Sequence, residues 1–137
     1  MSFYGIFDLA ASSLSAQNIR LNTIASNMAN MDSVATNETE AYRAKQPLFS
    51  TLLKNSWFDD GMAGVEVRGI VESLAPPRKE YQPNHPLADE QGYLFYSNVN
   101  PIEEMANMIS ASRSYQNNLE IINTAKQMLL RTFSLGQ

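Results

Sequence analysis

Mainly apolar residues recur with alternating steps of three and four at both ends of this 137-residue chain. The first repeat covers Phe7, Ala10, Leu14, Gln17, Leu21, Ile24, Met28 and Met31, and the second covers Met105, Met108, Ser112, Tyr115, Leu119, Ile122, Lys126, Leu129 and Phe133. Sustained spacing of this kind is typical of helices that pack along a seam. We therefore predict two terminal helices that form a coiled-coil-like pair and can also pack against neighbouring copies.

The two helical arms leave only a short region between them. We expect an N-terminal arm at 1–35, a charged middle region at 36–99 and a C-terminal arm at 100–137. A middle region of this size is near the lower limit for a self-sufficient core. The predicted fold is therefore mainly α, with a short β-rich middle that contains long loops.

Turn-forming residues and apolar runs divide the middle region into short segments. We expect an irregular connector at 32–46, a strand or short helix at 47–58, a turn at Gly61 and Gly64, a half-buried strand at 65–72, an extended stretch at 81–86 and a short aromatic strand at 92–96. Most charged residues of the chain fall between positions 38 and 104. We expect this region to face solvent or polar partners.

The arms differ in how strongly they signal their structure. Asn100 is a good N-cap, Pro101 suits the first helical position, and Glu103 can reach back to the cap, so a helix should begin there. The first arm, at about 3–30, carries a polar face rich in serine and asparagine, and between Leu9 and Met31 Arg20 is its only charge. Exposed helices usually carry Lys and Glu pairs. We infer that this face meets other protein, and a modestly stable surface helix is the alternative.

Composition excludes several classes of function. The net charge of −4 and pI near 4.9 argue against nucleic-acid binding. The chain has no cysteine, which removes disulfides and thiolate sites together. No run of about 18 apolar residues exists, so direct membrane insertion is not expected, and no secretory signal is evident. A cytosolic protein fits these facts, and so does one exported without a cleaved signal.

Candidate catalytic residues are few. His85 is the only histidine, and nearby Asp89 is its most obvious acidic neighbour. No phosphate-binding loop, nucleophile elbow or zinc-binding helix motif is present. We therefore predict no enzyme activity, no cofactor and no metal. Three hypotheses remain: a structural assembly subunit, a soluble helical binding module such as a secretion chaperone or adaptor, and a small hydrolase that uses His85.

Several segments resemble the axial proteins of the bacterial flagellum, the family that includes the rod and hook proteins. Residues 25–30 (Ala-Ser-Asn-Met-Ala-Asn) resemble its N-terminal asparagine-rich box, and residues 112–118 with Thr124, Met128 and Leu135 resemble its C-terminal box. Residues 81–89 with Gly92-Tyr93, and residues 97–100 leading into Glu103-Glu104-Met105, are similar to the proximal rod proteins of that family. The resemblance covers nearly the whole chain.

This resemblance implies a structural subunit of the flagellar basal-body rod, exported into the periplasmic rod without a cleaved signal. The expected partners are other copies of the chain, other proximal rod proteins, the basal rod adaptor and the flagellar export apparatus. We expect the terminal helices to form the inner rod core. The predicted subunit-packing residues are Phe7, Leu14, Leu21, Ile24, Asn27, Met28, Asn30, Met105, Met108, Arg113, Tyr115, Asn118, Leu119, Ile122 and Leu129.

Overall fold

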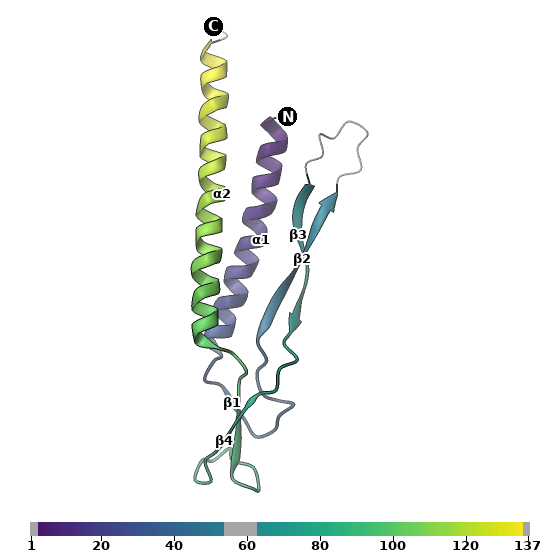
Figure 1. Ribbon diagram of the computed structural model, residues 1–137, viewed down its shortest axis with the longest axis vertical. Helices are drawn as coiled ribbons and strands as arrows, with labels where there is room; N and C mark the ends of the chain where they lie inside the picture. Colours follow the sequence, from purple (N-terminus) through teal and green to yellow (C-terminus); the bar gives the residue numbers. More distant parts are fainter. Residues whose placement is uncertain (1–2, 54–62, 136–137) are drawn as a thin grey trace.

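A computed structural model of the chain describes residues 3–53 and 63–135. Helix α1 spans Phe3–Ala29 and helix α2 spans Pro101–Leu135, and the two run antiparallel side by side (Figure 1). Between them lie strands β1 (Val34–Ala35), β2 (Lys45–Leu53), β3 (Ala63–Glu72), β4 (Arg78–Tyr81) and β5 (Tyr93–Tyr96). The prediction of a mainly α chain with a small β region is confirmed.

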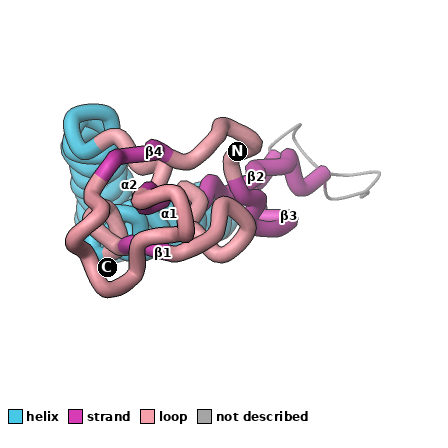
Figure 2. Tube along the Cα trace, turned by 90° about the horizontal axis from the view of Figure 1, so that it is seen from below, coloured by secondary structure: helices cyan, strands magenta, loops and turns pink. Residues whose placement is uncertain are grey.

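The strands form two separate antiparallel sheets. β2 and β3 make a long hairpin that packs along α1, so that α1 contacts both α2 and the hairpin. β1, β5 and β4 make a small sheet with β5 in the centre, at the end of the molecule away from the chain termini. Figure 2, which views the molecule from that end, shows the loops and the small sheet in front of the helices.

Helix α2 is longer than α1 and begins where local sequence predicts. Asn100 caps it, because its side-chain Oδ1 accepts a hydrogen bond from the backbone N–H of Ile102 at 3.1 Å. The helix contains 35 residues and α1 contains 27, a difference of eight. The C-terminal end of α2 therefore extends beyond the start of α1, as Figure 1 shows.

The middle region follows the predictions in part. The strands expected at 65–72 and 92–96 are present as β3 and β5. The segment 47–58 contains a strand as far as Leu53, and the rest of it lies outside the described residues. The connector at 32–46 is mostly irregular, but β1 and the start of β2 interrupt it.

Two expectations for the middle region were wrong. Gly64 lies inside β3 and not in a turn, because the partner strand β2 extends as far as Leu53; Gly61 lies outside the described residues. The stretch 81–86 is not extended after Tyr81. Its prolines lie in turns closed by backbone hydrogen bonds from His85 to Gln82 and from Ala88 to His85, which redirect the chain from β4 to β5.

The core is small for a chain of this length. Among residues 3–53 and 63–135, the largest side chains with under 2% exposure are Leu94, in the small sheet, and Asn27, on α1. Apart from Ile24, the buried apolar residues of the helix pair are alanines: Ala10, Ala16, Ala111 and Ala125. Short side chains let two helices approach closely, but they bury little apolar area, so the single chain gains limited stabilisation from its own packing.

Candidate assembly interface

Asn27 holds the β2–β3 hairpin against helix α1. Its side-chain Nδ2 donates to the carbonyl oxygen of Lys45 at 2.8 Å, and its Oδ1 accepts from the backbone N–H of Lys45 at 2.9 Å. The hydroxyl of Tyr42 donates to the same Oδ1 at 3.0 Å. Asn27 is only 1% exposed, so its amide satisfies the backbone at the first residue of β2 inside the chain.

A second pair of polar residues joins the loops below the helices. Asn98 Oδ1 accepts from the backbone N–H of Ala44 at 2.7 Å, and its Nδ2 donates to the carbonyl of Ala75 at 2.7 Å. The hydroxyl of Ser97 donates to the carbonyl of Met31 at 2.6 Å. These contacts connect four segments that are distant in sequence, so they fix the start of α2 relative to the end of α1.

Glu104 is a buried carboxyl at the start of α2. It is 6% exposed, and among the described residues its Oε2 has no hydrogen-bond partner. Burial raises the pKa of this carboxyl above its ordinary value of 4.5, and the negative charge of Glu103 acts in the same direction. A hydrogen bond from the Asn27 side chain and the positive charge of Arg20 act against that rise in pKa. At this carboxyl the effect of burial on the pKa therefore outweighs the effects of Asn27 and Arg20.

The predicted packing residues have three different environments. Ile24 and Asn27 are buried within the chain, whereas Met105, Arg113 and Leu119 are exposed. The remaining ten are half-buried: Phe7, Leu14, Leu21, Met28, Asn30, Met108, Tyr115, Asn118, Ile122 and Leu129. Asn27 and Asn30 form hydrogen bonds within the chain. Asn30 Nδ2, for example, donates to the carbonyl of Ser26 at 2.8 Å. Whether these fifteen residues pack between subunits stays a prediction.

The most exposed apolar side chains of α2 were largely absent from the predicted set. Those that are at least 48% exposed are Ile102, Met105, Ile109, Ile121, Met128, Leu130 and Phe133, and only Met105 among them was predicted. The three-four repeat from Met105 to Phe133 omits five of them, because Ile102 precedes it and the other four lie at other positions around the helix. A plain count of large apolar residues on α2 that are off the seam would have found them. A helix surface of this kind is unusual for an isolated protein and indicates a contact surface.

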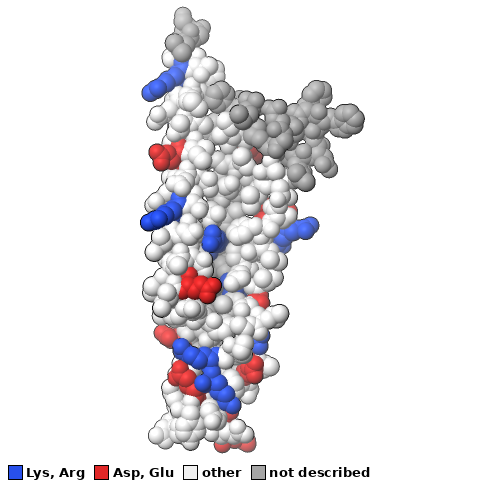
Figure 3. All heavy atoms as spheres, viewed as in Figure 1, with Lys and Arg blue, Asp and Glu red and all other residues white. Residues whose placement is uncertain are grey.

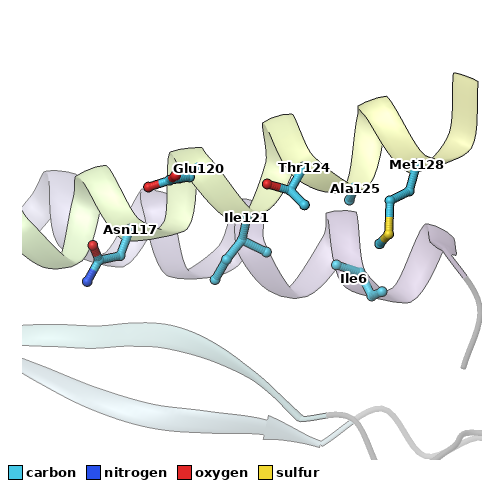
Figure 4. A pocket seen from close by; sticks show the side chains of 7 residues that line it. All are labelled: Ile6, Asn117, Glu120, Ile121, Thr124, Ala125 and Met128. Atoms are coloured by element: carbon cyan, nitrogen blue, oxygen red, sulfur yellow. The ribbon is translucent and has the colours of Figure 1, made fainter. Parts of the chain in front are cut away.

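A groove lies between the helices near the start of α1. It has a volume of about 470 Å³ and is lined mainly by apolar side chains, including Ile6 of α1 and Ile121, Ala125 and Met128 of α2. Figure 4 shows Ile121 and Met128 pointing from α2 toward α1, with Glu120 and Thr124 at the edge. The groove is therefore apolar at its floor and carries an acidic group at its rim.

Charged side chains are sparse along the helices. Figure 3 shows them as isolated spots on this face, separated by broad uncharged surface. Arg78 and Glu80 of β4 form an ion pair, with 3.2 Å between Nε of Arg78 and Oε1 of Glu80. A helix pair with little charge and many exposed apolar groups is suited to packing against other protein.

The sole histidine takes part in a turn. His85 Nδ1 accepts from the backbone N–H of Leu87 at 3.1 Å, and Asp89 Oδ1 accepts from the backbone of Gln91 and Tyr93 at 2.9 and 2.8 Å. Both side chains therefore shape the connection between β4 and β5. Across residues 3–53 and 63–135, no group of three acidic or histidine side chains is placed to hold a metal ion, and neither helix has an apolar stretch that could cross a membrane.

Comparisons with known proteins agree with these features. Residues 7–35 match the family described as "Flagella basal body rod protein", and residues 90–135 match "Flagellar basal body rod FlgEFG protein C-terminal". The flagellar basal-body rod protein FlgC of Yersinia enterocolitica is 49% identical over 137 residues, and those of Escherichia coli and Salmonella typhimurium are each 47% identical over 137 residues; every match covers both chains completely. The chain, with its two terminal helices and their exposed apolar side chains, belongs to the FlgC family of flagellar basal-body rod proteins.

Proposed function

We propose that this chain is a structural subunit of the proximal part of the flagellar rod and helps transmit torque through it. In this proposal, arms 1–35 and 100–137 form the inner core of the rod, and region 36–99 lies outside it. Full-length similarity to FlgC proteins supports the rod assignment. It does not favour the alternative of a secretion chaperone or adaptor.

One observation carries this proposal further than similarity alone. Several large apolar side chains of α2 are exposed, while four of the five buried apolar residues of the helix pair are alanines. Burial of apolar surface is the main favourable term in association, at roughly 25 cal/mol per Å². A chain that leaves this surface uncovered gains most of its stabilisation when neighbouring subunits cover it.

The finer assignments follow from the same physical picture. The proposed partners are other copies, other proximal rod proteins and the basal rod adaptor, in the periplasmic part of the basal body. A small core favours passage through the flagellar export apparatus in an unfolded form without signal cleavage, because little stabilisation must be given up. The proposed role needs no enzyme activity, and the loop positions of His85 and Asp89 support this.

A matched pair of substitutions on one face of α2 tests the proposal. Ile109 is 57% exposed, and Gln116 lies seven residues later on the same exposed face. Ile109→Asp should abolish swimming, because assembly would bury an unpaired carboxylate. Gln116→Ala, which adds no charge to this face, should leave swimming normal. Circular dichroism of both purified variants checks that helicity is unchanged.

The location of the protein provides the decisive measurement. Purified basal bodies should contain the wild-type chain and lack Ile109→Asp. Normal swimming by Ile109→Asp, or absence of the wild-type chain from basal bodies, would contradict the proposal.

A further inference from the structure

The exposed apolar residues of α2 lie on two opposite sides of the helix. Ile121 and Met128 face the groove beside α1, whereas Leu130 and Phe133 are exposed elsewhere. Ile121 and Leu130 are nine residues apart, about two and a half helical turns, so their side chains point in opposite directions. One partner that covers a single side cannot bury both sets, and this favours a head-to-tail series of copies.

Two of these residues lie near the end of α2. Phe133 is 68% exposed and Leu130 is 57% exposed, in the part of α2 that extends beyond the start of α1. Neither residue can enter the groove of its own chain, because both lie on the same continuous helix as the groove residues Ile121 and Ala125. The chain thus has both an apolar groove and an apolar projection that only another copy can bring together.

Charge indicates the direction in which a second copy would lie. Glu120 lines the groove, and Lys126 shares one helix face with Leu130 and Phe133 at spacings of four and seven. A parallel copy shifted by about eight residues, roughly 12 Å, would place its Phe133 level with Ala125. The same shift places its Lys126 within two residues of the level of Glu120. An antiparallel copy would carry Lys126 away from Glu120.

We propose that the groove lined by Ile6, Ile121 and Met128 binds the end of α2 from a second, parallel copy of this chain. Phe133 and Leu130 of the second copy fill the groove, and its Lys126 pairs with Glu120 at the rim. This inference rests on the proposed function and adds to it a partner, a direction and a stagger. The contact is heterologous, so each copy offers a groove to one neighbour and a projection to another.

Cysteine cross-linking tests this contact, because the natural chain contains no cysteine. Thr124 lies at the groove, and Leu130 lies on the proposed projection. The variant Thr124→Cys/Leu130→Cys should give a ladder of oxidised species at multiples of 15.3 kDa in isolated basal bodies. Six residues on one helix are too far apart for a disulfide within the chain.

A control pair has nearly the same height on the helix but a different direction. Thr124→Cys/Arg131→Cys moves the second cysteine by one residue, about 100° around α2, and should give no ladder. Equal products from both pairs, or none from the first while the chain is present in basal bodies, would overturn the contact. So would a product containing a different protein. If the chain is absent from basal bodies, the proposed function fails, and the same pairs on the concentrated purified chain decide the contact.

Charge reversal tests the direction separately. In the Thr124→Cys/Leu130→Cys background, Glu120→Lys or Lys126→Glu should lower the ladder yield several-fold, and the two together should restore it. A double reversal that stays as low as the single ones would overturn the parallel arrangement.

Discussion

The side-chain amide of Asn27 is hydrogen-bonded to both backbone polar groups of Lys45, at 2.8 and 2.9 Å, and so joins helix α1 to strand β2. The two residues are 18 positions apart, and an irregular segment separates their elements. A side-chain amide has the same donor and acceptor as a backbone peptide group. At the edge of the hairpin, Asn27 therefore makes the two backbone hydrogen bonds to Lys45 that a neighbouring strand would otherwise make.

Removing this amide should loosen the hairpin from the helix. Asn27→Ala leaves the N–H and carbonyl of Lys45 and the hydroxyl of Tyr42 without this partner, so we expect a loss of about 1–3 kcal/mol in the free energy of unfolding. Urea unfolding followed by circular dichroism measures it. Asn22→Ala, at an exposed position of the same helix, should change the value by less than about 0.5 kcal/mol. Equal effects from both substitutions would refute this role.

Glu104 should make the stability of the chain depend on pH. Because the folded-state pKa is raised, the folded protein favours the protonated form. The contribution of Glu104 to folding stability is complete below the unfolded-state pKa of 4.5. It is lost as the pH rises through the higher pKa of the folded state. Glu104→Gln should therefore be more stable than wild type at neutral pH, and this gain should shrink as pH falls toward 4.5.

The comparison for Glu104 uses an exposed acid. Urea midpoints of wild type, Glu104→Gln and Glu90→Gln should be measured over the same pH series. Glu90 is exposed in the connection between β4 and β5, so its substitution should give little change at any pH. If the stability gain of Glu104→Gln over wild type grew as the pH fell, the raised pKa of Glu104 would be contradicted.

The helix seam should tolerate larger side chains poorly. Ala111 is fully buried, with 0% exposure, and a leucine there must push the helices apart or distort its own rotamer. We expect Ala111→Leu to lower the free energy of unfolding by about 1–3 kcal/mol. Ala106→Leu, at an exposed position of the same helix, should be nearly neutral. Equal melting temperatures for the two variants would disprove close packing of the helices at Ala111.

Gly92 should resist replacement because of its backbone conformation and its surroundings. Its φ is +82°, and an added Cβ would lie 2.8 Å from Cε2 of Tyr81 and 3.1 Å from Cβ of Pro83. The left-handed conformation alone costs an alanine about 1–2 kcal/mol. Gly92→Ala should lower the melting temperature, whereas Gly69→Ala should not, since an added Cβ at Gly69 meets no atom within 4 Å. A similar loss in both would argue against this account.

Local sequence signals predicted the helix boundaries well. The start of α2 depends on Asn100 and Pro101, and capping involves only residues within one turn, so a single sequence contains the needed information. The family resemblance drawn from residues 25–30 and 112–118 is also confirmed. The aromatic strand β5 was predicted for a similar reason, because its four residues favour strand on their own.

Sequence alone could not say which side of each helix is buried in the single chain. Large apolar residues dominate the three-four pattern, yet Ala111 and Ala125 are the buried apolar residues of α2, and Leu119 is exposed. The three-four pattern identifies apolar surfaces of a helix, but it does not indicate whether α1 or another subunit covers them. The hydrogen-bond partner of Asn27 could not be predicted for a different reason. Lys45 is 18 residues away in sequence and comes close to Asn27 only when the chain folds.

The antiparallel helices bring the two chain termini to one end of the molecule and leave the β4–β5 turn at the other (Figure 1). This geometry decides where a fluorescent or affinity label belongs. A label on either terminus would sit where the proposed contacts between copies are made, whereas the turn around 83–87 joins β4 to β5 at the opposite end of the molecule. Exposed turns of this kind are the sites at which insertions are best tolerated. A short epitope inserted there reports on the subunit without occupying the surface that its neighbours need.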